Sequence, residues 1–170
     1  MIRMPEPMQQ GHSVSGTIGG IMAQNEMGEP FADPDLRTVM GFVLPRWQRG
    51  SVWSIEQQTR FIESVWLGMP LGTYTVNRPR HDNHPMSGYL LDGQQRITAL
   101  ANWLEDGFEV FGARWSDVDD YSRRRFKITK FSSFETSFEN EHEAMLYYDV
   151  MNFGGTPHQE HERAIRPGDE

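Results

Sequence analysis

One segment restricts the possible folds of this chain more than any other part of its sequence. In it, a short apolar run stops at an Asp-Gly pair, after which apolar residues recur with helical spacing. Residues 89–91 (Tyr-Leu-Leu) are typical of a buried strand, and Asp92-Gly93 is typical of a sharp turn. Apolar residues then recur with the period of one helix face: Ile97, Leu100, Ala101 and Leu104. The sequence therefore predicts a strand, a turn and a helix in direct succession.

Two further strands and a helix are predicted upstream of this unit. Residues 42–44 form a short apolar run that a proline stops, and residues 73–76 favour a second strand. Between them, Ser54 and Gln57 have the spacing of a capping box, which predicts the start of a helix. Residues 77–87 show no periodicity and are predicted to be a surface loop.

Downstream of the unit, residues 125–129 are predicted to form a strand and residues 141–151 a helix. The inward side chains of that helix are expected to be Ala144, Tyr148 and Met151. Because short strands and helices alternate along the chain, the predicted fold class is α/β (α+β).

The length of 170 residues is within the usual range for one domain, which can bury roughly 70% of the surface that its unfolded chain exposes. Residues 1–36 show no sustained period and are predicted to be an irregular arm, with one short helix near residues 15–25. The domain itself is expected at residues 37–163, followed by a charged tail at residues 164–170.

The composition excludes several kinds of site. Because the chain has no cysteine, it has neither a disulfide framework nor a thiolate metal site nor a cysteine nucleophile. It also lacks the HExxH pattern of zinc enzymes and the GxxxxGK[ST] pattern of P-loop enzymes. No apolar run approaches the ~20 residues that span a bilayer, so we expect a cytoplasmic protein with no membrane partner.

The formal net charge of −8 argues against a protein that coats DNA without specificity, because such proteins need a basic surface. The charge is uneven, however. Residues 37–130 hold thirteen basic and ten acidic side chains, whereas the segments on either side are acidic. Fourteen of the sixteen cations are arginines, which suit bidentate contact with phosphate or carboxylate, although a compositional bias explains them equally well.

The predicted strand–turn–helix around Asp92 could form an anion site. The N-terminus of the helix offers unpaired backbone N–H groups and a positive dipole end, and Gly93 allows a ligand to come close. Arg96 could add a bidentate fork to a phosphate, while Asp92 could bind a divalent metal or orient water. The simpler alternative is that Asp92 caps the helix and Arg96 forms a surface ion pair.

Two other segments carry chemistry-bearing residues. Residues 44–53 contain Arg46, Gln48, Arg49 and two tryptophans, which offer phosphate donors and stacking surfaces; the tryptophans could equally anchor the loop to the core. Residues 152–158 (Asn-Phe-Gly-Gly-Thr-Pro-His) allow close backbone approach to a ligand. His158 could act there as a general acid or base, or simply be exposed.

Four segments together carry a family resemblance. Residues 44–54 run Leu-Pro-Arg-Trp-Gln-Arg-Gly-Ser-Val-Trp-Ser, and residues 68–72 run Gly-Met-Pro-Leu-Gly. Residues 91–100 run Leu-Asp-Gly-Gln-Gln-Arg-Ile-Thr-Ala-Leu, and residues 152–158 follow as quoted above. In this order, over roughly residues 40–163, they resemble the GmrSD-type N-terminal domain family with its DGQQR motif, a branch of the ParB/sulfiredoxin-like superfamily.

The resemblance implies a small domain with a mixed sheet flanked by helices that binds a nucleoside triphosphate (ATP, GTP or another NTP) with Mg²⁺. In restriction systems, related domains hydrolyse nucleotides and couple this to cleavage of modified DNA by a second, nuclease domain. The chain leaves no room for such a nuclease after its last motif. We therefore expect a minimal, stand-alone member, of the kind a phage could encode, that acts with DNA or a modified base and with a nuclease or modification-enzyme partner.

The leading hypothesis from the resemblance is an enzyme that hydrolyses or transfers a terminal phosphoryl group. Its expected catalytic residues are Asp92, Gln95, Arg96 and Arg49. Its expected nucleotide-binding residues are Gln48, Arg49, Gly93, Gln94, Arg96, Asn152, Gly155, Thr156 and His158. Asp92 is the expected metal ligand, and Arg49 is expected to neutralise charge that develops in the transition state.

Three alternatives stay open from the sequence. The first is a kinase that phosphorylates a modified base in DNA or a nucleoside. The second is a non-catalytic nucleotide sensor, or an inhibitor of a restriction partner. The third is a ParB-like nuclease, which the acidic composition does not favour.

Overall fold

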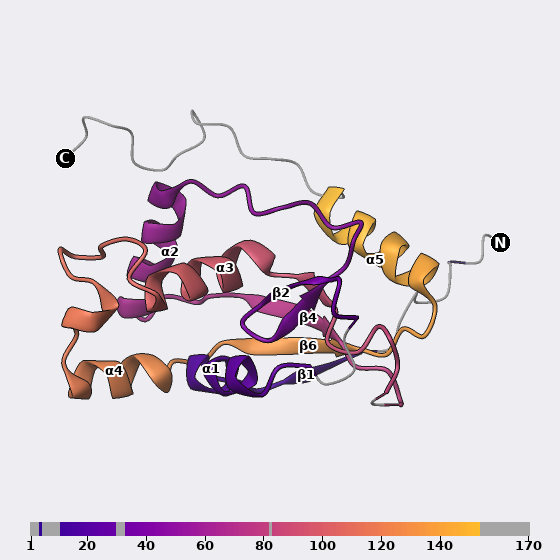
Figure 1. Ribbon diagram of the computed structural model, residues 1–170, viewed down its shortest axis with the longest axis horizontal. Coiled ribbons are helices and arrows are strands. Elements are labelled where there is room, and N and C mark those ends of the chain that lie inside the picture. The colour runs from indigo at the N-terminus through magenta and orange to yellow at the C-terminus, as the bar shows by residue number, and fades with distance from the viewer. Residues whose placement is uncertain (1–3, 5–10, 30–32, 82, 154–170) are drawn as a thin grey trace.

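The sheet at the centre of the fold is mixed, with four strands in the order β1-β6-β4-β5 (Figure 1). These strands are β1 (His12–Val14), β6 (Ser132–Thr136), β4 (Thr73–Asn77) and β5 (Leu90–Asp92). β4 and β6 are parallel, whereas the two outer pairs, β1 with β6 and β4 with β5, are antiparallel. The computed structural model describes residues 4, 11–29, 33–81 and 83–153.

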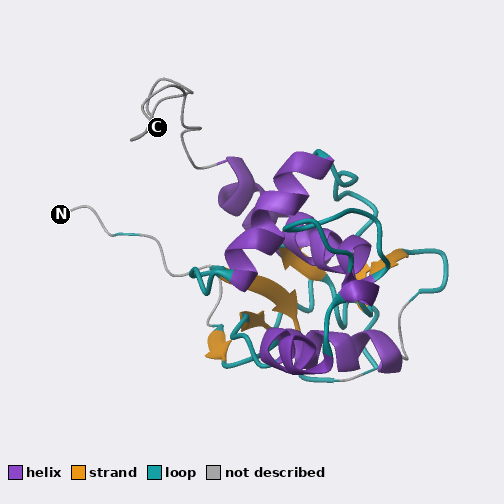
Figure 2. Cartoon of the chain, turned by 90° about the vertical axis from the view of Figure 1, so that its left-hand side faces the viewer, coloured by secondary structure: helices purple, strands orange, loops and turns teal. Residues whose placement is uncertain are grey.

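Five helices flank the sheet within these described ranges: α1 (Ile18–Met27), α2 (Ile55–Trp66), α3 (Gln94–Leu104), α4 (Asp120–Lys127) and α5 (Glu141–Phe153). Both views place α1 and α4 below the sheet and α3 and α5 above it (Figures 1 and 2). α2 packs against α3, and α5 packs against β5. The predicted α/β class, with a mixed sheet between helices, is therefore confirmed. No helix of the described chain is long and apolar enough to cross a bilayer.

A separate hairpin packs against the domain beside α3. It consists of β2 (Arg37–Val39) and β3 (Phe42–Leu44), joined by a tight turn in which Gly41 has a φ of 77°. A Cβ atom at Gly41 would collide with the carbonyl of Gln24 in α1, so only glycine allows this close approach. The hairpin contacts α3 through β2 and the main sheet through a parallel bridge between Val43 and Tyr89.

The apolar core has two parts. The larger part includes an aromatic cluster at the junction of α2, α3 and α4, formed by Trp66, Trp103, Trp115 and Phe126. The centroids of the contacting ring pairs in this cluster are 4.9–5.7 Å apart. The smaller part joins the hairpin, β5 and α5 through six buried side chains: Val43, Met86, Tyr89, Leu91, Phe138 and Ala144. This smaller part holds α5 against the rest of the domain.

Several local predictions are confirmed. Ser54 caps α2 in a complete capping box with Gln57, because each side chain bonds the backbone N–H of the other residue. The β5–turn–α3 unit has the predicted bounds within one or two residues. In α5, Ala144 and Tyr148 are buried as expected, but Met151 is 50% exposed, so that part of the prediction is wrong.

The strand predicted at residues 125–129 is wrong. Residues 120–127 form α4, because the Asp119 side chain caps the helix by accepting a hydrogen bond from the Ser122 backbone N–H. This contact holds the pKa of Asp119 below its usual value. The strand of this region is β6, which begins at Ser132.

The prediction of an irregular N-terminal arm differs from the structure in one respect. The expected short helix is present as α1, which begins at Ile18 after the side-chain cap of Thr17. Residues 12–14, however, form β1 and pair with β6 over the register His12–Glu135 to Val14–Ser133. The side chain of Ile18 is fully buried, so this segment contributes to the core.

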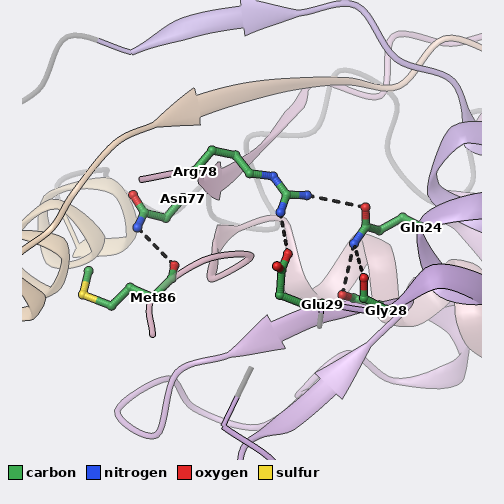
Figure 3. A network of polar contacts seen from close by, with 7 residues as sticks. Gln24, Gly28, Glu29, Asn77, Arg78 and Met86 are labelled. Atoms are coloured by element: carbon green, nitrogen blue, oxygen red, sulfur yellow. Dashed lines mark hydrogen bonds and ion pairs between the residues drawn. The ribbon is translucent and has the colours of Figure 1, made fainter. Parts of the chain in front are cut away.

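A buried polar centre fixes the end of β4 (Figure 3). The Asn77 side chain is completely buried, and its amide nitrogen donates to the carbonyls of Met86 and Phe138 at 3.2 and 2.9 Å. Its amide oxygen accepts from Thr136 Oγ1 at 3.0 Å and from the Phe138 backbone N–H at 2.8 Å. Beside it, Arg78 forms an ion pair of 2.6 Å with Glu29. Every hydrogen-bonding position of the Asn77 amide is used.

Candidate functional site

Three segments that are distant in sequence meet at one cavity of about 140 Å³ at the N-terminus of α3. The loop after β3 contributes Gln48, Arg49 and Trp53; the β5–α3 turn contributes residues 92–96; and α5 contributes Tyr148 and Asn152. Eight of the residues predicted from the sequence line this cavity: Gln48, Arg49, Asp92, Gly93, Gln94, Gln95, Arg96 and Asn152. The predicted residues Gly155, Thr156 and His158 lie outside the described residues.

The N-terminus of α3 has no side-chain cap within the described chain. Gly93 occupies the N-cap position with φ 93° and ψ 5°, and no side chain there accepts from the first turn. Asp92 does not cap the helix, so that alternative is wrong. A Cβ atom at Gly93 would lie 2.6 Å from Tyr74 Cβ, which together with the positive φ explains the glycine. The first-turn N–H groups of α3 are therefore left for another partner.

Arg96 is held by backbone carbonyls and by Asp92. Its Nη1 donates to Leu71 O at 2.8 Å, and its Nη2 donates to Thr73 O at 2.8 Å and to Asp92 Oδ2 at 2.9 Å. Its guanidinium also lies 5.7 Å from the centroid of the Phe131 ring. Arg96 thus forms an ion pair, as that alternative predicted; its partner is Asp92, and the pair is partly buried rather than on the surface. Arg96 ties the start of β4 to the end of β5.

Gln95 attaches the loop before α2 to the same helix end. Its Oε1 accepts from Ser51 Oγ at 3.1 Å and from the backbone N–H groups of Val52 and Trp53 at 2.9 and 3.1 Å. A carbonyl oxygen with three donors has no capacity left to orient a water molecule. In this arrangement, Gln95 positions the loop that carries Gln48 and Arg49.

Gln48 is buried, with 5% of its surface exposed, and its Oε1 has no hydrogen-bond partner within the described chain. Its backbone is fixed on both sides, because its N–H donates to Pro45 O and its carbonyl accepts from Arg37 Nη2 at 2.7 Å. A buried acceptor without a partner costs about 1–3 kcal/mol. Gln48 lines the cavity, so this oxygen is a candidate acceptor for a donor from outside the chain.

Arg49 and Asp92 are the other charged groups that line the cavity besides Arg96. Arg49 is exposed, and no hydrogen bond or ion pair joins it to another described residue. Asp92 is the single acid among the lining residues. Mg²⁺ in nucleotide sites is usually held by one or two carboxylates together with phosphate oxygens and water. Asp92 fits that pattern, and no cluster of three metal-ligating side chains exists among the described residues.

Two aromatic walls of the cavity were not predicted as site residues. Tyr148 was expected only in the core, and Trp53 either as a stacking surface or as an anchor, and both line the cavity. Trp47 lies behind Tyr148, with ring centroids 5.1 Å apart, and its Nε1 donates to Glu141 Oε1 at 3.1 Å. Trp53 packs against Phe61 of α2. The alternative that the tryptophans anchor their loop is therefore confirmed, and the helical spacing of Tyr148 and Asn152 was the signal available for the α5 wall.

The fold and the site define a small α/β domain with a polar cavity at an uncapped helix N-terminus. The protein family described as "GmrSD restriction endonuclease, N-terminal domain" matches residues 31–149, which include the loop after β3 and the DGQQR segment. The chain belongs to this family of ParB/sulfiredoxin-like domains, and it is thereby linked to restriction systems. No curated protein and no solved structure matches the chain.

Proposed function

We propose that this domain binds a nucleoside triphosphate at the N-terminus of α3 and hydrolyses or transfers its terminal phosphoryl group, as part of DNA restriction or modification. One observation carries the proposal. An uncapped helix N-terminus, an exposed arginine and the buried, unpartnered Gln48 Oε1 meet in one cavity. Helix N-termini bind anions, and an arginine beside one adds charge-assisted hydrogen bonds to phosphate.

The phosphates are assigned to Arg49 and to the first-turn N–H groups of α3. Arg49 has an exposed guanidinium with no partner among the described residues, whereas the guanidinium of Arg96 already makes three hydrogen bonds. Arg96 therefore serves mainly as a positioning residue in this proposal. Its contacts hold Asp92 and the turn at Gly93 in the geometry that presents the helix N-terminus to the ligand.

Gln48 and Gln94 are assigned to uncharged groups of the reactants. Gln48 Oε1 is an acceptor, so its partner is an uncharged donor, such as the attacking water or the acceptor hydroxyl, rather than a phosphate oxygen. Gln94 bonds the ligand at the start of α3 in this proposal, whereas Gln95, whose Oε1 is already saturated, positions the loop rather than water. Asn152 donates to Tyr148 O at 2.9 Å and closes the cavity from α5.

Asp92 is the proposed metal ligand. Bound Mg²⁺ would neutralise phosphate charge at the reacting centre. In hydrolysis, a water oxygen attacks the γ-phosphorus, the bond to the β–γ bridging oxygen breaks, and the proton of the water passes to solvent. In transfer, an acceptor hydroxyl takes the place of water. The contribution of Arg49 would be to stabilise the charge on the transferred group.

The test measures phosphate release from each NTP and dNTP with Mg²⁺, with and without DNA. Arg49→Ala is compared with wild type and with Arg60→Ala, a matched control whose exposed arginine pairs with Glu56 away from the cavity. We expect turnover in wild type and Arg60→Ala, and a loss of at least about 100-fold in Arg49→Ala. Absence of both nucleotide binding and turnover in the wild type contradicts the proposal.

The same assay distinguishes the other three functions. Label from the γ-phosphate on a DNA base or a nucleoside identifies a kinase. Nucleotide binding without turnover identifies a sensor or an inhibitor that acts through a partner. Metal-dependent nicking of DNA without nucleotide identifies a nuclease.

A DNA contact is proposed at α4. Residues 119–130 hold five basic and two acidic side chains in a chain of net charge −8, and they include both of its lysines. Arg124, Arg125, Lys127 and Lys130 are exposed there. α4 and α5 lie towards opposite ends of the long axis (Figure 1), so DNA at α4 leaves the nucleotide cavity open. We expect the double variant Lys127→Glu/Lys130→Glu to weaken duplex binding in fluorescence anisotropy and to reduce its salt dependence. An unchanged affinity removes this contact from the proposal.

A further inference from the structure

The cavity at the α3 N-terminus is too small for a whole nucleotide. Its volume of about 140 Å³ lies below the roughly 300–1,000 Å³ of typical small-molecule pockets. It has room for phosphate groups, so the nucleoside part of the ligand must lie elsewhere. A second, larger space begins at the same helix end.

That second space is a groove of about 600 Å³ between α3 and the β2–β3 hairpin. One face of α3 forms its floor, through residues at helical spacing: Gln94, Thr98, Ala101, Asn102 and Glu105. The hairpin and its surroundings form the other wall: Arg37, Thr38, Val39, Met40 and Leu44, with Asn25 of α1 and Ser51 at the edges. From Gln94 to Glu105 the groove follows about 16 Å of helix, which is long enough for a nucleoside.

Gln94 joins the two spaces. Among the residues that the structure describes, it is the one that lines both the phosphate cavity and the groove. Only 6% of its surface is exposed, and no hydrogen bond joins its amide to another residue of the described chain. Its amide faces two pockets and is not enclosed by the fold, so it is free to bond a ligand group in either space. It is placed to bond the ligand where phosphates and sugar meet.

We infer that the groove along α3 binds the nucleoside of the nucleoside triphosphate, while its phosphates occupy the cavity at the helix N-terminus. This inference rests on the proposed function. Val39, Met40 and Ala101 provide an apolar surface for the base, and the Glu105 carboxylate accepts N–H groups from its edge. The Asn102 amide nitrogen is already bonded to Gln58 Oε1 at 2.7 Å, so its oxygen is oriented as a further acceptor.

The experiment compares calorimetric binding of inorganic tripolyphosphate with that of ATP, GTP, CTP and UTP, each with Mg²⁺. Thr98→Trp fills the groove without touching the phosphate cavity. In this variant we expect the preferred NTP to lose at least about 10-fold in affinity and to bind no better than tripolyphosphate, while tripolyphosphate binding is unchanged. Ile128→Trp, at a side chain that is 72% exposed beyond the end of α4, is the matched control and keeps wild-type affinity for both.

The outcomes separate the inference from the function on which it rests. Wild-type NTP affinity in Thr98→Trp overturns the nucleoside groove and leaves the phosphate site intact. If the wild-type protein binds neither tripolyphosphate nor any NTP, the proposed function itself fails. If Thr98→Trp loses tripolyphosphate as well, the smaller Thr98→Leu variant decides. An NTP loss of a few-fold with tripolyphosphate retained supports the groove, and unchanged NTP affinity overturns it.

Discussion

Two buried amide side chains in this domain have opposite surroundings. Asn77, at the end of β4, is completely buried and has a partner for both of its N–H groups and for both lone pairs of its oxygen. Gln48, in the loop after β3, is 5% exposed, and its Oε1 has no partner in the described chain. The same chemical group is therefore satisfied by the fold in one place and left incomplete in the other.

Under the proposed function, the difference separates a group that stabilises the fold from one whose acceptor is completed by a bound donor. A satisfied buried amide rigidifies its surroundings, since every neighbour that it bonds would otherwise lack a partner. An unsatisfied one reduces stability, and beside the cavity, where Gln48 lies, a ligand donor would compensate for the cost. If this distinction is correct, substitution of Asn77 should reduce stability, and substitution of Gln48 should reduce binding.

Asn77→Leu should have the largest effect. It leaves three buried groups without a partner, the Phe138 carbonyl, the Thr136 hydroxyl and the Phe138 backbone N–H, and the Met86 carbonyl keeps only the longer bond of 3.4 Å from the Tyr89 N–H. We expect the free energy of unfolding to fall by about 4 kcal/mol or more, as measured by urea denaturation. A loss below about 1 kcal/mol would show that this network does not stabilise the fold.

Arg96→Leu tests a residue that shares features of both amides. Arg96 lines the cavity, as Gln48 does, but its guanidinium is bonded by the fold, as the amide of Asn77 is. We expect it to lower the free energy of unfolding by about 2–3 kcal/mol, because Leu71 O, Thr73 O and Asp92 each lose a donor. Nucleotide binding should fall with it.

Arg96→Lys separates positioning from direct contact with phosphate. Lysine keeps the charge but cannot reproduce the fork that reaches the carbonyls of both Leu71 and Thr73. A positioning residue should lose stability and affinity together in this variant. Wild-type stability with weakened binding would instead identify Arg96 as a phosphate ligand.

Gln48→Leu should have a smaller effect, and on a different quantity. The free energy of unfolding should not fall and should rise by up to about 1–3 kcal/mol, because the variant removes a buried acceptor without a partner while the backbone bonds to Pro45 and Arg37 remain. NTP affinity, measured by calorimetry, should fall about 10-fold, which corresponds to about 1.4 kcal/mol. A stability loss comparable to that of Asn77→Leu would remove the distinction between the two amides.

The parts of the fold that were predictable from the sequence depend on neighbours along the chain. The capping box at Ser54 and the β5–turn–α3 unit are local patterns, and both are present. β1 was missed because its three residues become a strand only by pairing with β6, more than one hundred residues away. The strand predicted at residues 125–129 failed because the Asp119 cap, a local signal that was overlooked, begins a helix instead.

The site followed the same division. Motif spacing was enough to name eight residues that line one cavity. It could not reveal that Gln95 and Arg96 are bonded to the backbone of Val52, Trp53, Leu71 and Thr73, because those contacts depend on tertiary structure. For the same reason, the missing partner of Gln48 Oε1 could not be predicted from the sequence.

Tyr74 gives the smallest and most specific test, because it is a third buried polar group and lies directly beneath Gly93 of the cavity. Burial raises the pKa of the Tyr74 phenol above its usual value of 10, and a hydrogen bond with Ser133 opposes this only in part. A folded-state pKa above the unfolded value stabilises the fold at lower pH, and this contribution is lost as pH rises above 10. Urea denaturation between pH 9 and 11 should therefore show a decline that is shallower in Tyr74→Phe than in wild type. Burial also raises the pKa of the Tyr89 phenol, so some decline in stability should persist in the variant. An identical slope in both proteins would mean that Tyr74 ionises as freely in the folded state as in the unfolded chain.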